Sequence, residues 1–345
     1  MTIRTLTLVS SLAILVATSA QAAGPADRPW MNPKLSADER AALLEKELTL
    51  DERIGLVHGP MSMPIFGITK PEGAIGSAGY IPGIARLGVP ALQESDASLG
   101  VTNPLGVRPG DGATVLPSGQ ALAATFNTRL AYEGGAVVGR EARAKGFNVQ
   151  LAGGVNLARD PRNGRNFEYL GEDPWLAGNL AGASIKGIED QGIVSTIKHF
   201  SLNGQETSRH FANSVIDEAA HRESDLLAFQ IAIEKGQPGS VMCAYNLVNG
   251  DYSCGNDHLL NTVLKGDWAY KGWVMSDWGA VHATDYIVKG LDQQSGEQLD
   301  AKIWFGAPLK AAVEKGEIPA ARLSDASRRI LRSMFAAGLF DKPVS

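Results

Sequence analysis

The feature that most constrains the fold is an alternation between short apolar runs and helical patterns. The apolar runs, several of them rich in β-branched residues, are Val89–Leu92, Val149–Ala152, Val194–Ile197, Ser240–Cys243 and Trp273–Met275. Between several of them, helical patterns occupy Thr128–Lys145 and Glu218–Lys235, and a glycine follows each pattern directly. Strands that alternate with helices predict βα units and a parallel sheet.

Two parallel architectures compete, the doubly wound open sheet and the eight-stranded βα barrel. The sequence lacks the dinucleotide fingerprint G-x-G-x-x-G in the required setting and lacks the phosphate loop. Polar residues follow the apolar runs each time: Glu94 and Asp96, Asn156, Lys198 and His199, Tyr245 and Asn246, and Asp277. Because the carboxyl ends of barrel strands meet at one face, these side chains would converge. We therefore predict a single-domain (β/α)8 barrel of the TIM-barrel type, with irregular first strands.

The first 22 residues are predicted to be a signal peptide. Arg4 is their only charge, Leu6–Val16 is mostly apolar, and Ala20-Gln21-Ala22 has the form of a cleavage site. The apolar run is too short to span a bilayer comfortably. Cleavage would leave residues 23–345 as a periplasmic or secreted barrel domain without a membrane anchor. An ordinary N-terminal helix is the alternative.

Charge and metal-ligand spacing exclude other classes of protein. The chain has 32 basic and 37 acidic residues, a net charge of −5, which argues against a nucleic-acid partner. The six histidines show no H-E-x-x-H spacing and the two cysteines no C-x-x-C spacing, so we predict neither a metal site nor a cofactor. Cys243 and Cys254 can form a disulfide in an exported protein, and a buried free thiol at Cys243 is the alternative.

The segment Gly272–Trp278 delivers a carboxylate, Asp277, to the end of a buried strand and places an indole directly after it. A glycosidase needs such a nucleophilic carboxylate, together with an aromatic face for the apolar side of a pyranose. Taken alone this pattern is ambiguous, since an aspartate often caps whatever follows a strand.

Three further motifs accompany the segment that contains Asp277 and make its interpretation specific. The chain reads R-D-P-R-N-G-R-N-F-E at Arg159–Glu168, K-H-F at Lys198–Phe200, M-C-A-Y-N at Met242–Asn246 and V-M-S-D-W at Val274–Trp278. In this order the motifs resemble glycoside hydrolase family 3 of the β-glucosidase type, over Leu48–Pro343. The cysteine pair also resembles one found in fungal-type members.

The resemblance implies a role for each matching position. Asp277 matches the nucleophile that attacks the anomeric carbon, Trp278 would stack on the sugar, and Asp96 would hold the outer hydroxyls of the non-reducing sugar. The family usually has D-G-P where this chain has Asp96-Ala97-Ser98, so the loop after Asp96 departs from the pattern. The remaining matches are donors to sugar hydroxyls and a tyrosine beside the nucleophile: Arg165, Lys198, His199, Arg209 and Tyr245. Glu168 and Glu172 are instead expected to brace their loop, and Arg159 and Asp160 to form a structural salt bridge.

The resemblance further implies an exo-acting, retaining hydrolase without a cofactor. It would release β-linked glucose or xylose from the non-reducing ends of oligosaccharides or from aryl and alkyl β-glycosides. Family members of this type take the acid/base glutamate from a second, α/β-sandwich domain, and we expect that domain to be absent from a chain that ends at Ser345. Two other functions stay open, a sugar-binding barrel without the general acid and a metal-dependent barrel hydrolase that uses His199 and Asp277.

Overall fold

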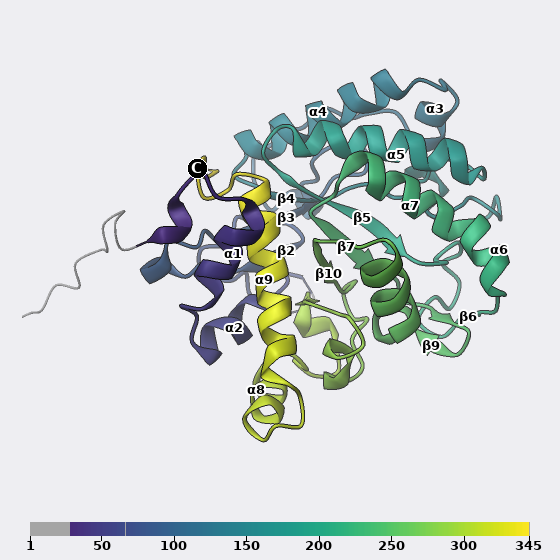
Figure 1. Cartoon of the computed structure of the whole chain (residues 1–345). Coiled ribbons are helices and arrows are strands. Elements are labelled where there is room, and N and C mark those ends of the chain that lie inside the picture. Colours follow the sequence, from purple (N-terminus) through teal and green to yellow (C-terminus); the bar gives the residue numbers. More distant parts are fainter. Residues whose placement is uncertain (1–27, 66, 345) are drawn as a thin grey trace, which may run out of the picture.

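The computed structural model describes residues 28–65 and 67–344, so the predicted signal peptide lies outside the described residues. The described part contains a curled sheet surrounded by helices (Figure 1). The strands are β1 (His58–Gly59), β2 (Gly79–Ile81), β3 (Leu92–Asp96), β4 (Val149–Leu151), β5 (Val194–Phe200), β6 (Asn213–Ser214), β7 (Ser240–Cys243), β8 (Leu247–Val248), β9 (Asp251–Tyr252), β10 (Trp273–Met275) and β11 (Gln294–Ser295).

Eight of these strands close into a ring. One sheet has the order β10-β7-β5-β4-β3-β2, and β1 pairs with β11. A parallel bridge between Met275 and Gln293 joins β10 to the start of β11, and an antiparallel bridge between Met61 and Gly79 joins β1 to β2. The predicted eight-stranded barrel is therefore confirmed.

The prediction that the first strands are irregular is also confirmed. Strand β2 runs antiparallel to β3, whereas the other pairs within the six-stranded sheet are parallel. The segment Met61–Pro82 is rich in glycine and proline, which predicts a long loop, but this prediction is wrong at its end, because β2 lies there. Non-local backbone bonds hold this strand in place: Tyr80 donates to Pro60 O (3.1 Å), and Ala78, just before it, donates to Glu94 O (3.0 Å).

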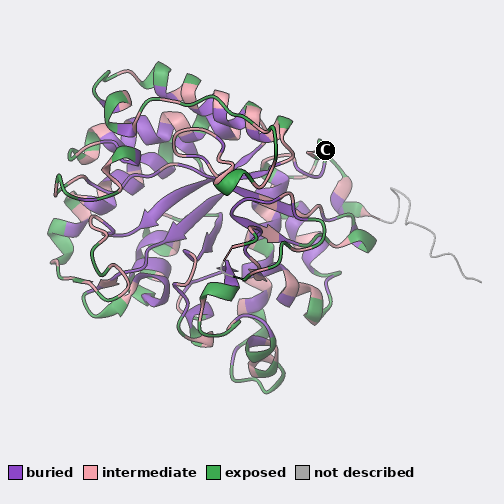
Figure 2. Ribbon diagram, turned by 180° about the vertical axis from the view of Figure 1, so that it is seen from behind, coloured by how far each residue is buried: buried purple, intermediate pink, exposed green. Residues whose placement is uncertain are grey.

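The helices lie outside the ring, and the strands within it are buried (Figure 2). Helices α4, α5 and α7 cover one side of the sheet, and α1 packs beside α9 on another (Figure 1). The described helices are α1 (Ala37–Glu45), α2 (Leu50–Leu56), α3 (Gly119–Ala123), α4 (Thr128–Ala144), α5 (Pro174–Glu189), α6 (Glu218–Glu223), α7 (Asp225–Gly236), α8 (Ala307–Glu314), α9 (Ala320–Ala336) and a π-helical segment, His258–Asp267. None of the helices among the described residues combines the length and the apolar character needed to cross a membrane.

Small residues let α4 and α5 approach each other closely. A Cβ atom added at Gly135 would lie 2.0 Å from the carbonyl oxygen of Ser184, and one added at Gly187 would lie 2.2 Å from that of Tyr132. Both distances are far below van der Waals contact, so a larger residue at either position would push the helices apart. This layer supports β4 and β5, which carry part of the site described below.

Two predicted helix details are wrong. The pattern Glu218–Lys235 is broken at Ser224, whose φ of −122° and ψ of −100° are not helical. Its hydroxyl donates to Ala220 O (2.6 Å), and the buried carboxylate of the next residue, Asp225, turns to pair with Arg159. Such local bonding by serine competes with the helical ladder. The sequence also predicts that Ser324 caps the last helix, but Ser324 lies inside α9, because the helix already begins after Pro319.

Candidate active site

The predicted site residues lie at or beyond the carboxyl ends of the ring strands. Asp96 is the last residue of β3, Lys198 and His199 are near the end of β5, Tyr245 follows β7 by two residues, and Asp277 follows β10 by two. Parallel strands bring these ends to one face of a barrel. The barrel topology therefore gathers residues from four separate segments.

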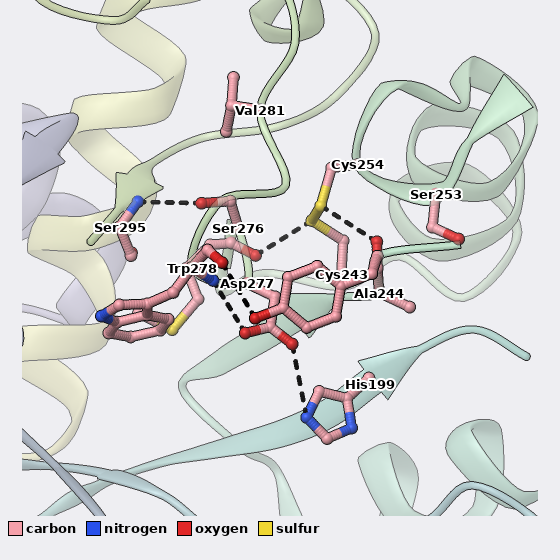
Figure 3. Close-up of a disulfide and its surroundings, with 12 residues drawn as sticks. His199, Cys243, Ala244, Ser253, Cys254, Ser276, Asp277, Trp278, Val281 and Ser295 are labelled. Carbon is pink, nitrogen blue, oxygen red and sulfur yellow. Dashed lines mark hydrogen bonds and ion pairs between the residues drawn. A yellow bond between two sulfur atoms is a disulfide. The ribbon is translucent and has the colours of Figure 1, made fainter. Parts of the chain in front are cut away.

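Asp277 has one bound and one unbound carboxylate oxygen. Its Oδ1 accepts a hydrogen bond from the backbone N–H of Trp278 (2.8 Å). Its Oδ2 lies 3.6 Å from His199 Nε2 and is buried without a hydrogen bond to any residue of ranges 28–65 and 67–344 (Figure 3). Burial raises the pKa of Asp277, and the positive charge of Arg165 opposes that rise. Oδ2 is therefore the carboxylate oxygen whose capacity to accept a hydrogen bond is unused.

The surroundings of His199 assign its tautomer. Arg165 Nη2 lies 2.9 Å from His199 Nε2, and a guanidinium can only donate. Nε2 is therefore the acceptor, and Nδ1 carries the proton that faces Asn156 Oδ1 at 3.3 Å. Burial lowers the pKa of His199, and Arg165 and Lys198 lower it further, so the ring is neutral. Because Nε2 carries no proton, His199 cannot donate a hydrogen bond to Asp277 Oδ2.

A second group of charges surrounds Glu168. Lys198 Nζ lies 3.2 Å from Asp96 Oδ1 and 3.9 Å from Glu168 Oε2, while Arg165 Nε donates to Glu168 Oε1 (2.5 Å). The hydroxyl of Ser98 also donates to Glu168 (2.7 Å). Burial would raise the pKa of Glu168, but Lys198 and Arg165 outweigh it and lower that pKa. Glu168 braces its loop as predicted through these contacts. Glu172, in contrast, is exposed and has no hydrogen bond or ion pair with another described residue, so the bracing role predicted for it is not confirmed.

Tyr245 connects the segment after β7 to the segment after β10. Its hydroxyl donates to the backbone oxygen of Trp278 (3.0 Å), and the guanidinium of Arg209 stacks 4.1 Å from its ring centroid. His210 lies on the same ring, with centroids 4.4 Å apart. His210 was not predicted as a site residue, and its only signal in the sequence is that it follows Arg209.

The structure contains the predicted disulfide between Cys243 and Cys254 (Figure 3). Both sulfurs are buried, and Cys243 Sγ lies 3.3 Å from the carbonyl oxygen of Met275, two residues before Asp277. The bridge thus links the end of β7 to the turn that follows β9, beside the end of β10, the strand that precedes Asp277.

Two predicted residues lie apart from this cluster. Arg159 pairs with Asp225, and Asp160 pairs with Arg162 (3.0 Å), so the salt bridge predicted for Arg159 and Asp160 is wrong and each residue has a different partner. A hollow of about 570 Å³ opens beside the cluster, with Asp96, Arg165 and Lys198 among its lining residues. In the described part of the chain, no three His, Cys, Asp or Glu side chains are grouped as metal ligands.

A βα barrel that gathers carboxylates, cations and an indole at one face has the groups that a glycosidase uses. Residues 83–333 match the sequence model of the glycosyl hydrolase family 3 N terminal domain, and the chain belongs to this family. It is similar to thermostable β-glucosidase B of Acetivibrio thermocellus, with 36 % identity over 301 residues that cover 85 % of this chain and 37 % of that protein. It is also similar to β-glucosidase 1 of Aspergillus aculeatus, with 34 % identity over 90 % of this chain and 36 % of that protein.

Solved structures show the same relationship. A β-glucosidase from Streptomyces venezuelae in complex with D-glucose has 40 % identity and a TM-score of 0.81, over 89 % of this chain and 39 % of that one. β-Glucosidase 3B of Thermotoga neapolitana in complex with α-D-glucose has 35 % identity and a TM-score of 0.82, over 89 % of this chain and 44 % of that one. The chain thus spans less than half the length of these relatives.

Proposed function

We propose that this chain is the nucleophile-bearing barrel of an exported, exo-acting glycoside hydrolase of the β-glucosidase type. Its substrates would be oligosaccharides or aryl and alkyl β-glycosides, from whose non-reducing ends it releases glucose or xylose. The similarity to β-glucosidases supports the substrate class, and the pattern of the first 22 residues supports export. The observation that carries the proposal is the buried, unbound Oδ2 of Asp277 at the end of β10.

The proposed reaction is a double displacement that retains the anomeric configuration. Asp277 Oδ2 donates an electron pair to the anomeric carbon, the glycosidic C–O bond breaks, and a general acid protonates the leaving oxygen. Water, deprotonated by the conjugate base of that acid, then attacks the same carbon and releases Asp277. The family resemblance assigns the acid to a glutamate of an α/β-sandwich domain, outside the residues described for this chain.

The other side chains would bind and orient the sugar. Asp96 would accept hydrogen bonds from the outer hydroxyls, and Lys198 beside it would donate to their oxygens, since fixed donors and acceptors read a ring of hydroxyls well. Arg165, 2.9 Å from His199, places a positive charge close to Asp277 and thereby favours its ionised, nucleophilic form. Trp278 would pack against the apolar side of the sugar ring.

Covalent labelling tests the nucleophile directly. The reagent is 2,4-dinitrophenyl 2-deoxy-2-fluoro-β-glucoside, whose leaving group departs without a general acid and whose fluorine slows hydrolysis of the intermediate. We expect one sugar on the peptide that contains Asp277. The labelling rate should fall as the pH decreases through a value above 3.8, the ordinary pKa of an aspartate, because burial raises the pKa of Asp277 and only the ionised form attacks.

The control is Asp277→Asn, which keeps the size of the side chain and removes its charge. It should fold and remain unlabelled. Labelling at a different carboxylate, such as Asp96 or Glu168, would refute the assignment of the nucleophile.

The two alternative functions give different results. A sugar-binding barrel would bind glucose but would neither be labelled nor turn over an activated aryl glycoside in the presence of azide, which replaces water as the nucleophile. A metal-dependent hydrolase would lose its activity in the presence of a chelator, whereas the proposed reaction is unaffected.

A further inference from the structure

The indole of Trp278 lies directly against the backbone of Gly296. A Cβ atom added at Gly296 would be 1.9 Å from Cδ1 of the indole and 2.4 Å from both Cγ and Nε1. Ordinary contacts between such atoms are about 3.5 Å or longer, so a side chain of any size at this position requires the indole or the backbone to move by roughly 1.5 Å. Gly296 also has a φ of +61°, which favours glycine.

Bonds between β10 and β11 hold Gly296 at this place. The backbone N–H of Ser295, the residue before Gly296, donates to the hydroxyl of Ser276 (2.9 Å), the residue before Asp277 (Figure 3). Ser276 in turn donates its N–H to the backbone oxygen of Gln293 (2.9 Å). The two segments are thus fixed in register beside Asp277, and Gly296 cannot shift independently of that residue.

Further contacts, at the start of β2, restrict the movement of the Trp278 indole. Its Nε1 donates to the backbone oxygen of Ala78 (3.2 Å), and a Cβ atom added at Gly79 would lie 3.2 Å from Cζ2. The ring is therefore held between Gly79 of β2 and Gly296, which directly follows β11. An indole held in this way has little freedom to move when a neighbour is enlarged.

The position of Trp278 affects the orientation of the Asp277 carboxylate. The backbone N–H of Trp278 binds Asp277 Oδ1, and its backbone oxygen accepts the hydroxyl of Tyr245. A displacement of Trp278 would disturb both bonds, and with them the orientation that leaves Oδ2 unbound.

We propose that Gly296 is a positioning residue for the nucleophile, which it orients through the indole of Trp278. The proposal rests on the proposed function, in which Asp277 attacks the sugar. In this role Gly296 acts through Trp278 and does not itself contact the substrate. It keeps the indole in the one position that leaves Asp277 Oδ2 directed at the anomeric carbon.

The test compares Gly296→Ala with Gly316→Ala in the full chain, using the fluoro-glucoside label. Gly316 has a φ of +74° and no atom within 4 Å of an added Cβ, so it reproduces the backbone strain without the clash. We expect Gly296→Ala to lower the maximal labelling rate constant about 100-fold, as a displacement of about 1 Å can do, and Gly316→Ala to label as the wild type does. Equal labelling by both variants would overturn the proposal.

A double-mutant cycle with Trp278→Ala separates positioning from general damage. In that background there is no indole to displace, so Gly296→Ala should change the labelling rate less than about 3-fold and should not impair folding further. If Gly296→Ala unfolds the chain with the indole present but not without it, the clash is still demonstrated. An equal effect in both backgrounds would overturn the proposal. Absence of labelling in the wild type would instead contradict the proposed function.

Discussion

The charge of Glu168 is predicted to hold two cations of the site in place, and Glu168→Gln tests this. The substitution preserves the shape of the side chain and its capacity to accept the Ser98 hydroxyl, but it leaves Lys198 and Arg165 without their shared partner. The side chains of Glu168 and Lys198 are only 5 % and 4 % exposed, and their charged atoms are 3.9 Å apart.

The expected loss follows from these distances. With an effective dielectric constant of about 20, two charges about 4 Å apart attract each other by about 4 kcal/mol. Relief of the desolvation of Glu168 offsets part of that amount, and breaking one side of a buried pair costs about 3–5 kcal/mol in measured cases. We therefore expect Glu168→Gln to reduce the free energy of unfolding by about 3 kcal/mol, measured by urea denaturation at pH 7.

The control is Glu172→Gln, an exposed glutamate four residues later, which should change the free energy by no more than about 0.5 kcal/mol. The effect should also depend on pH. Because the pKa of Glu168 is lowered from 4.5 in the folded state, its stabilisation is complete above pH about 4.5 and is lost as the pH falls through the folded-state pKa. The difference between wild type and variant should therefore shrink at low pH. A variant as stable as Glu172→Gln, or a constant difference at all pH values, would refute the reasoning.

Two further predictions concern the disulfide and the sugar contacts. Replacing Cys243 and Cys254 together by alanine should lower the free energy of unfolding by about 3 kcal/mol, because the bridge closes a loop with a sequence separation of 11, and unchanged urea unfolding would contradict this. Asp96→Ala should weaken glucose binding by about 3 kcal/mol or more if the carboxylate accepts two hydroxyl bonds of about 1.5–3 kcal/mol each. Calorimetry that finds the affinity unchanged would make Asp96 a structural residue.

The sequence by itself determined the parts of the fold that depend on near neighbours. The sequence Ser36-Ala37-Asp38-Glu39 and the sequence Thr49-Leu50-Asp51-Glu52 each predict a capping box, and both capping boxes are formed. Strands β7 and β10 begin and end where their apolar runs do. The polar residues that follow these strands indicated the location of the site, because barrel topology turns the ends of parallel strands toward one face.

Only the tertiary structure decided how the ring closes. Strands β1, β2 and β11 have two or three residues each, too few to show a period of two in the sequence. They exist because backbone groups far along the chain pair with them. The same holds for the break at Ser224, where the pairing of Asp225 with Arg159, distant in sequence, accompanies a backbone that the helical pattern does not predict.

For the site, too, the sequence identified the residues, whereas only the tertiary structure decided their contacts. The residue types and their order pointed to Asp277 and to the donors around it, because the motifs are continuous in sequence. The free oxygen of Asp277, the tautomer of His199 and the contact between Gly296 and Trp278 depend on atoms brought together by the barrel. Trp278 Nε1, for instance, bonds a carbonyl 200 residues away. No local pattern records such a contact, since its distance in space is set by the closure of the ring and the packing of its strands.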